Sequence, residues 1–189
     1  GPCASKKLEA MRRTVRSDVD FVLTFEELDA MFDAREIDPA SFEEDGSLHD
    51  ATAAGRGYAV AGGVAGAIEA CLKEYYPDVP VHIEHAESLA ECKKVLALAK
   101  AGKLKGCMIE GMACPGGCVG GGGQPIHDGE ELAHTRGANL YFLDKNAKIR
   151  FSHENQDVMK LYNDFLEKPL SHKSHMLLHT DHTKWDMPR

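Results

Sequence analysis

The chain has 189 residues, of which 43% are hydrophobic and 28% are charged, the composition of a globular domain or of a large part of one. Its 30 acidic and 22 basic side chains give a formal net charge of −8, which argues against a nucleic-acid partner because phosphate binding requires a basic surface. No apolar run is long enough to predict a membrane span.

The chain begins with neither a methionine nor the apolar core of a signal peptide. We therefore expect a cytoplasmic protein and further sequence upstream of Gly1. Six cysteines without an export signal favour metal ligation over disulfide bonds. Three of them, Cys71, Cys92 and Cys107, are expected to be small buried hydrophobic side chains.

The first predicted elements are a strand and a helix. Residues 20–23 form a short apolar run that indicates a buried strand. Thr24 and Glu27 then have the spacing of a capping box, so a helix should begin here and end before Pro39. The acidic and polar residues 41–57 are expected to form a loop.

Four further elements alternate between helix and strand. We expect a helix over 60–76, a strand over 79–83, a helix over 88–101 and a strand over 105–110. Glycines at the start of the first of these helices would let another backbone or a cofactor approach closely. The alternation indicates an α/β fold with a short parallel-type sheet flanked by helices.

The remaining elements are helical. Residues 130–134 indicate a short helix or turn, and Ser152 is expected to cap a helix whose apolar residues between Val158 and Leu166 share one face. Four histidines near the C-terminus recur at helical spacing, which fits either a histidine-bearing surface or adventitious metal binding. These histidines are His172, His175, His179 and His182.

The densest chemical signal is the segment 110–125, which holds Cys114 and Cys118 within a run of glycines. Thiolates are soft ligands suited to iron–sulfur clusters, and glycine lets backbone N–H groups approach sulfide without an intervening Cβ. A phosphate-binding loop would end in Gly-Lys-Ser/Thr, which does not follow here. A zinc site would need further ligands, for which His127 and His134 are the nearest candidates.

These residues carry a resemblance to a known family. Residues 112–125 resemble the third signature of the FeFe (iron-only) hydrogenases, M-A-C-x-G-G-C-x-x-G-G-G-x-P, and residues 1–9 resemble the second, M-P-C-x-x-K-x-x-E, with glycine replacing methionine. Residues 58–64 are similar to the family's F-G-A-T-G-G-V, and residues 152–162 resemble its S-H-E-N…L-Y helix. The resemblance implies that residues 1–189 are the C-terminal lobe of a hydrogenase catalytic domain.

The resemblance also implies a cofactor, the H-cluster, in which a 4Fe-4S cluster is joined to a two-iron unit bearing carbonyl, cyanide and a bridging dithiolate. Cys3, Cys114 and Cys118 match three of its four cysteine ligands, and Cys118 matches the ligand that also bridges to the two-iron unit. The family's first signature, T-S-C-S-P-G-W, is absent. We therefore expect the fourth cysteine to come from a missing N-terminal half or from a companion subunit.

Four other residues complete the implied site. Lys6 matches a lysine that hydrogen-bonds a cyanide, and Met112 matches a methionine that lines the cofactor pocket. Glu9 is expected to support Lys6 or a nearby backbone group, and Gly117 belongs to the cofactor-binding set. The implied reaction is the reversible reduction of protons to hydrogen.

The implied partners are ferredoxin or another electron-carrying subunit, together with the maturation proteins that insert the two-iron unit. Two other interpretations stay open: a sensory or low-turnover hydrogenase, and an iron–sulfur assembly factor, related to nuclear prelamin-recognition factors, that lacks the two-iron unit. Those factors tend to carry serine where Gly116 and Gly117 stand. A non-enzymatic domain of a larger redox complex is a third class.

Overall fold

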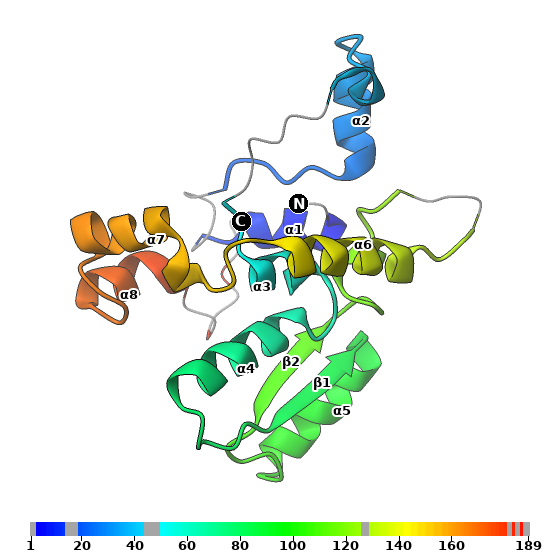
Figure 1. Cartoon of the computed structure of the whole chain (residues 1–189). Helices are drawn as coiled ribbons and strands as arrows, with labels where there is room; N and C mark the ends of the chain where they lie inside the picture. Colours follow the sequence, from blue (N-terminus) through cyan, green and yellow to red (C-terminus); the bar gives the residue numbers. More distant parts are fainter. Residues whose placement is uncertain are drawn as a thin grey trace. The chain divides into compact units, whose positions relative to one another are not determined.

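The structure is a computed structural model that describes residues 3–13, 19–43, 50–125, 129–180, 183 and 186. The chain forms two compact units. The helical unit comprises Gly1–Asp45, Gly122–Pro125 and Ser152–Arg189, and the sheet unit comprises Gly46–Gly121 and Ile126–Phe151. Figure 1 shows their elements along the chain.

The sheet unit is built on a β–α–β crossover. Strands β1 (Ile83–Glu87) and β2 (Met108–Met112) pair in parallel, and α5 (Leu89–Lys100) connects them. Such a pair requires a crossover because parallel strands cannot be joined by a tight turn. Helix α5 contacts both strands and α4 (Gly63–Tyr75) contacts β2, so that the two helices flank the pair in Figure 1. The expected α/β fold with a short parallel sheet is confirmed.

Both strands begin later than the sequence indicates. The first was expected over 79–83 but starts at Ile83, because Pro80 has no N–H to donate to a ladder. The second was expected over 105–110 but starts at Met108, after a turn in which Gly106 has a φ of +72°. Strand limits are therefore set by pairing and turns rather than by the apolar run.

Helix α6 (Ala133–Asn146) is much longer than the helix or turn expected over 130–134. The N-cap residue, Leu132, has no capping side chain, and Glu131 accepts the N–H of Ala133 at 2.7 Å instead. Gly137 lies in the helix interior, where glycine is unfavourable, so the sequence does not indicate so long a helix. A Cβ at Gly137 would lie 3.6 Å from the methyl groups of Val60, which explains the small residue by close packing.

The segment expected as a loop over 41–57 also contains a helix. Thr52 caps α3 (Ala53–Arg56), whose short length hides it from periodicity, and the 3₁₀ turn η2 (Gly57–Ala59) follows. Both elements pack against α6. The core of the sheet unit consists of small side chains, namely Ala53, Ala65, Ala67, Ala86, Val119 and Ala133.

The helical unit begins with α1 (Ala4–Ala10) and α2 (Phe25–Asp33). The capping box at the start of α2 is confirmed, since Glu27 donates its N–H to Thr24 and accepts that of Thr24. The strand expected over 20–23 is wrong: these residues form no ladder, and Phe21 is 84% exposed. An apolar run forms a strand only where a neighbouring strand is available to pair with it.

Helix α2 stops at Asp33, before Pro39, which starts the 3₁₀ turn η1 (Pro39–Ser41). The C-terminal part contains η4 (Ser152–Glu154), α7 (Gln156–Leu161), the π-helical turn η5 (Tyr162–Leu166) and α8 (His172–Leu178).

The cap expected at Ser152 is wrong. Asn155 caps α7 by accepting the N–H groups of Asp157 and Val158, because Ser152 opens a separate 3₁₀ turn. The apolar face is only partly buried: Leu166 is 2% exposed, whereas Phe165 is 49% exposed.

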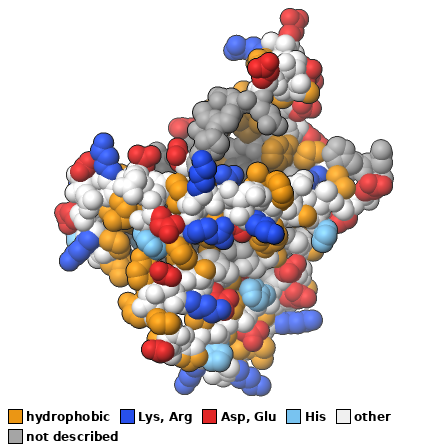
Figure 2. All heavy atoms as spheres, viewed as in Figure 1, with side chains coloured by type: hydrophobic (Ala, Val, Ile, Leu, Met, Phe, Trp, Pro, Cys, Tyr) orange, Lys and Arg blue, Asp and Glu red, His pale blue; other side chains and the backbone are white. Residues whose placement is uncertain are grey.

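Large apolar side chains are exposed in both units, as the hydrophobic atoms scattered over the visible face in Figure 2 illustrate. Among the described residues no large side chain is less than 2% exposed. The same residues contain no helix that is both long and apolar enough to span a membrane. Extensive apolar exposure is typical of surfaces that other protein segments cover.

Candidate functional site: the cysteine loop

The cysteine loop, residues 113–121, follows β2 directly. Met112 is the last residue of this strand, and Cys114 and Cys118 each begin a turn: the N–H of Gly117 donates to the carbonyl of Cys114 at 3.0 Å, and that of Gly121 to Cys118 at 3.1 Å. Both thiols are half-buried. The sequence therefore folds locally into two successive turns, each opened by a cysteine.

Gly117 shows why this loop requires glycine. Its φ of +91° and ψ of −160° lie in a region that essentially only glycine occupies. A Cβ would lie 2.5 Å from the nitrogen of Ala61 and 2.7 Å from the carbonyl oxygen of Ala59, both backbone atoms. Gly117 also forms an antiparallel bridge with Val60. The loop and the segment before α4 thus approach backbone to backbone.

Glycine also leaves room beside one thiol. A Cβ at Gly121 would lie 3.5 Å from the Sγ of Cys114 and 3.2 Å from the carbonyl oxygen of Cys118. None of the six cysteines, all within the described ranges, forms a disulfide. Two soft thiol donors on a backbone without bulky side chains fit part of an iron–sulfur ligand set. Within the described residues, no three His, Cys, Asp or Glu side chains gather as a metal site.

The other candidates lie on α1 of the helical unit. Cys3 precedes the helix in an extended conformation, and Lys6 and Glu9 follow at intervals of three residues. All three are half-buried, whereas Ser5 and Leu8 are exposed, which places them toward one side of α1. The structure thus groups Cys3, Lys6 and Glu9 on α1, and Met112, Cys114, Gly117 and Cys118 on β2 and its loop.

The neighbouring Lys7 makes a contact that the sequence did not indicate. Its Nζ donates to both carboxylate oxygens of Glu27, at 2.8 and 2.6 Å, and to the carbonyl of Val22 at 2.7 Å. Hydrogen bonding to Lys7, followed by that to the Thr24 amide, lowers the pKa of Glu27 below its ordinary value of 4.5. This ion pair connects α1 to the first turn of α2.

The remaining cysteines and histidines are not part of the cysteine loop. Cys71, Cys92 and Cys107 are half-buried rather than fully buried as expected. The rings of His175 and His179 stack with centroids 4.5 Å apart on α8, and His134 is exposed on α6. Gly1, His127 and His182 lie outside the described residues.

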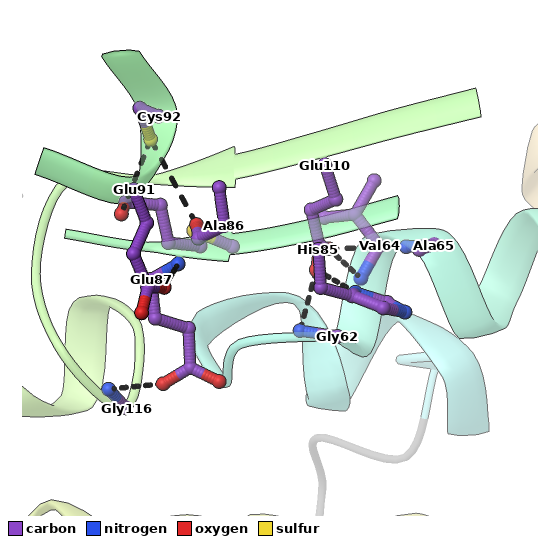
Figure 3. Close-up of polar contacts among 11 residues, drawn as sticks. Gly62, Val64, Ala65, His85, Ala86, Glu87, Glu91, Cys92, Glu110 and Gly116 are labelled. Carbon is purple, nitrogen blue, oxygen red and sulfur yellow. Dashed lines mark hydrogen bonds and ion pairs between the residues drawn. The ribbon is translucent and has the colours of Figure 1, made fainter. Parts of the chain in front are cut away.

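Glu110 is one residue near the loop that sequence reasoning missed. Its side chain is buried on β2 and accepts the N–H groups of Gly62, Val64 and Ala65 at 2.5, 3.0 and 3.1 Å (Figure 3). Three donors at the start of α4 are therefore taken by a carboxylate of the protein itself. A single acidic residue inside an otherwise apolar strand was the available signal, since buried charges need partners.

Comparisons with known proteins define the family. Residues 1–122 match the family model described as iron only hydrogenase large subunit, C-terminal domain, and residues 130–185 match the model of the iron hydrogenase small subunit. The chain belongs to the iron-only hydrogenase large-subunit family and represents its C-terminal domain. It also carries, on the same chain, a segment that matches the small-subunit model.

Individual relatives agree with this family. The chain is 36% identical over 220 residues to the NADP-reducing hydrogenase subunit HndD of Solidesulfovibrio fructosivorans, covering 97% of this chain but 37% of that protein. It is 27% identical to the probable cytosolic Fe-S cluster assembly factor narfl of Dictyostelium discoideum, covering 96% of this chain and 44% of narfl. The chain thus spans less than half of either relative.

A solved structure shares the fold. A variant of apo [FeFe]-hydrogenase HydA1 from Chlamydomonas reinhardtii matches with a TM-score of 0.66 and 29% identity, over 95% of this chain and 60% of that one. The resemblance read from the cysteine signatures is therefore confirmed at the level of family and fold.

Proposed function

We propose that residues 1–189 are the C-terminal part of an FeFe-hydrogenase catalytic domain, which reversibly reduces protons to hydrogen. The cysteine loop carries this proposal: two half-buried thiols begin consecutive turns on a backbone that tolerates only glycine at Gly117. A binding site for a metal–sulfur cofactor needs thiolates and close backbone N–H groups, and this loop offers both.

Three cysteines would hold the 4Fe-4S cluster: Cys3 from α1, and Cys114 and Cys118 from the loop. Cys118 would also bridge to the two-iron unit, and the fourth cysteine would come from an N-terminal half or a companion subunit. The large exposed apolar side chains, such as Leu89 at 74% and Phe142 at 67%, support such a covering segment.

The H-cluster, when bound, supplies the iron site at which protons and electrons combine to hydrogen. The residues of this chain orient the cofactor and exclude water from it. Lys6 would donate a charge-assisted hydrogen bond to a cyanide, and Met112 would present an apolar wall. Glu9 would hold Lys6 or a backbone group in place, and Gly117 would let the backbone approach the cofactor.

Electrons would come from ferredoxin or another electron-carrying subunit, and maturation proteins would insert the two-iron unit. Six cysteines without a disulfide favour a reducing compartment, for which we propose the cytoplasm. The likeness to a narfl protein supports a second candidate, an iron–sulfur assembly factor without the two-iron unit.

The geometry of Gly117 favours the hydrogenase. A serine here would place its Cβ within 3.0 Å of three backbone atoms, so the loop could not keep this conformation. Assembly factors that carry serine at this place would need a different loop. Glycine at Gly116 and Gly117 is therefore the feature that separates the two candidates.

The test compares two cysteine variants of the whole chain, purified without oxygen together with any companion. Cys118→Ala is expected to lose hydrogen evolution and bound iron, because it removes a bridging ligand. Cys71→Ala, a half-buried cysteine on α4, is the matched control and is expected to keep both. Hydrogen evolution by Cys118→Ala at the rate of Cys71→Ala would refute the proposal.

A further inference from the structure

We propose that Glu110 and Glu87 are positioning residues that fix the backbone of Gly116 and Gly117, and through it the thiol of Cys118. This inference rests on the proposed function, because positioning matters for catalysis only if Cys118 is a cofactor ligand. Both carboxylates and the loop belong to the sheet unit, so every contact involved lies within one compact body.

Glu110 holds the start of α4. Its carboxylate is 7% exposed and receives three backbone N–H groups, and the Nδ1 of His85 lies 3.3 Å from its Oε2 (Figure 3). Hydrogen bonds to a charged acceptor are about twice as strong as neutral ones. Four polar neighbours on one buried side chain therefore fix the segment that precedes α4.

This segment reaches the cysteine loop directly. The N–H of Ala61 donates to the carbonyl of Gly116 at 3.1 Å, and Val60 forms its bridge with Gly117. Gly62, whose N–H donates to Glu110, is the next residue along the chain. The amide nitrogen of Ala61, which is bound by the loop, and that of Gly62, which is bound by Glu110, are therefore adjacent along the backbone, so displacement of one transmits to the other.

Glu87 acts on the loop from β1. Its Oε2 accepts the N–H of Gly116 at 3.0 Å, and its own backbone N–H donates to the carboxylate of Glu91 at 2.9 Å (Figure 3). The next residue, Ser88, donates its N–H to the carbonyl of Met112 at 2.8 Å. The end of β1 therefore fixes both the beginning and the middle of the segment that carries the cysteines.

Together the two carboxylates restrain a backbone that would otherwise be mobile. The N–H of Gly116 is bound by Glu87, and its carbonyl is bound by the segment that Glu110 holds. Glycine has more backbone freedom to lose than any other residue, so fixing two in succession needs such contacts. Cys118 follows immediately, so the direction in which its side chain leaves the backbone is fixed as well.

The alternative is that Glu110 merely caps α4 and Glu87 makes an incidental surface contact. The two interpretations differ in what happens inside the cysteine loop. A cap alone would protect only the amides of residues 62–65 from hydrogen exchange. Positioning requires that both carboxylates protect residues 112–121, although they act from different strands.

The experiment measures amide hydrogen exchange and the alkylation rate of Cys118 by mass spectrometry, on the whole chain without metal. The variants are Glu87→Ala, Glu87→Gln and Glu110→Gln. The matched control is Glu84→Ala, an exposed glutamate on β1. In iron-loaded protein, the reduction midpoint of the cluster is the second readout.

Glu87→Ala is expected to speed exchange in 112–121 and alkylation of Cys118 by about tenfold, the effect of losing one charge-assisted hydrogen bond on a local opening equilibrium. Glu87→Gln should recover part of this effect, since an amide oxygen can still accept. Glu110→Gln should speed exchange in both 62–65 and 112–121, because an amide group cannot accept from all three donors. The control should match the wild type.

The proposal would be overturned if Glu87→Ala had the same rates of loop amide exchange and Cys118 alkylation as the control. If Glu110→Gln sped amide exchange only in residues 62–65, Glu110 would be no more than a helix cap, and this result would also overturn the proposal. Glu87 is exposed, so its variants carry the test even if Glu110→Gln does not fold. Failure of the proposed function would appear separately, as a wild type that binds no iron.

Discussion

Replacing Gly117 with alanine tests the backbone contact on which the cysteine loop depends. The added methyl group would lie 2.5 Å from the nitrogen of Ala61, 2.7 Å from the oxygen of Ala59 and 2.8 Å from the carbonyl carbon of Val60. Backbone atoms cannot turn aside as a flexible side chain can. The loop must therefore move away from the segment before α4.

The cost has two parts. Holding a non-glycine residue in this region of φ and ψ costs about 1 to 3 kcal/mol. Separating the two backbones also removes the hydrogen bond from Ala61 to Gly116, for about 1 kcal/mol, and weakens the bridge between Val60 and Gly117. We expect Gly117→Ala to lower the free energy of unfolding by about 3 kcal/mol.

Gly122→Ala is the matched control, because a Cβ there meets no atom within 4 Å and the φ is not left-handed. Its expected change is within about 0.5 kcal/mol. Urea unfolding followed by circular dichroism, with extrapolation to water, measures both variants. Equal midpoints for Gly117→Ala and Gly122→Ala would refute the close backbone contact.

Three further predictions concern the helical unit. Glu27→Gln should unfold at a lower urea concentration than the wild type at pH 7, and the difference should vanish as the pH falls below 4.5. Hydrogen bonding to Lys7 lowers the pKa of this carboxyl in the folded protein. The carboxylate therefore stabilises the fold above the pKa of the unfolded state, and this stabilisation is lost in acid. A difference that persisted in acid would contradict this. Asn155→Ala should cost about 1 kcal/mol and Ser152→Ala almost nothing, because only Asn155 caps α7; a reversed order in urea unfolding would restore the original cap assignment. Lys6→Met should keep iron in the 4Fe-4S cluster but impair retention of the two-iron unit. Normal occupancy of the two-iron unit, measured by elemental analysis and infrared spectroscopy, would refute the proposed contact between Lys6 and a cyanide.

Much of the fold could be read from local signals. The capping box at Thr24 and the alternation of helix and strand each predicted elements that the structure contains. Residues 20–23 and the limits of both strands could not be predicted, because strands are defined by their partners. Helix α6 was underestimated because its N-cap residue, Leu132, has no side chain that can cap a helix.

The site divides in the same way. Cys114 and Cys118 are recognisable as candidate ligands because residue type and spacing lie within one short segment. Glu110 and Glu87 are not, since their contacts with Gly62 and Gly116 span 48 and 29 residues. Local patterns indicate candidate ligands, whereas the carboxylates that contact the loop backbone become apparent only from tertiary packing.

The most direct test of the hydrogenase assignment is an infrared spectrum of the whole chain, purified without oxygen from its native host together with any companion. We expect carbonyl and cyanide stretching bands, which only the two-iron unit would supply, and expect Cys118→Ala to lack them. Bound iron without such bands in the wild type would contradict the assignment and favour a protein that holds the 4Fe-4S cluster alone.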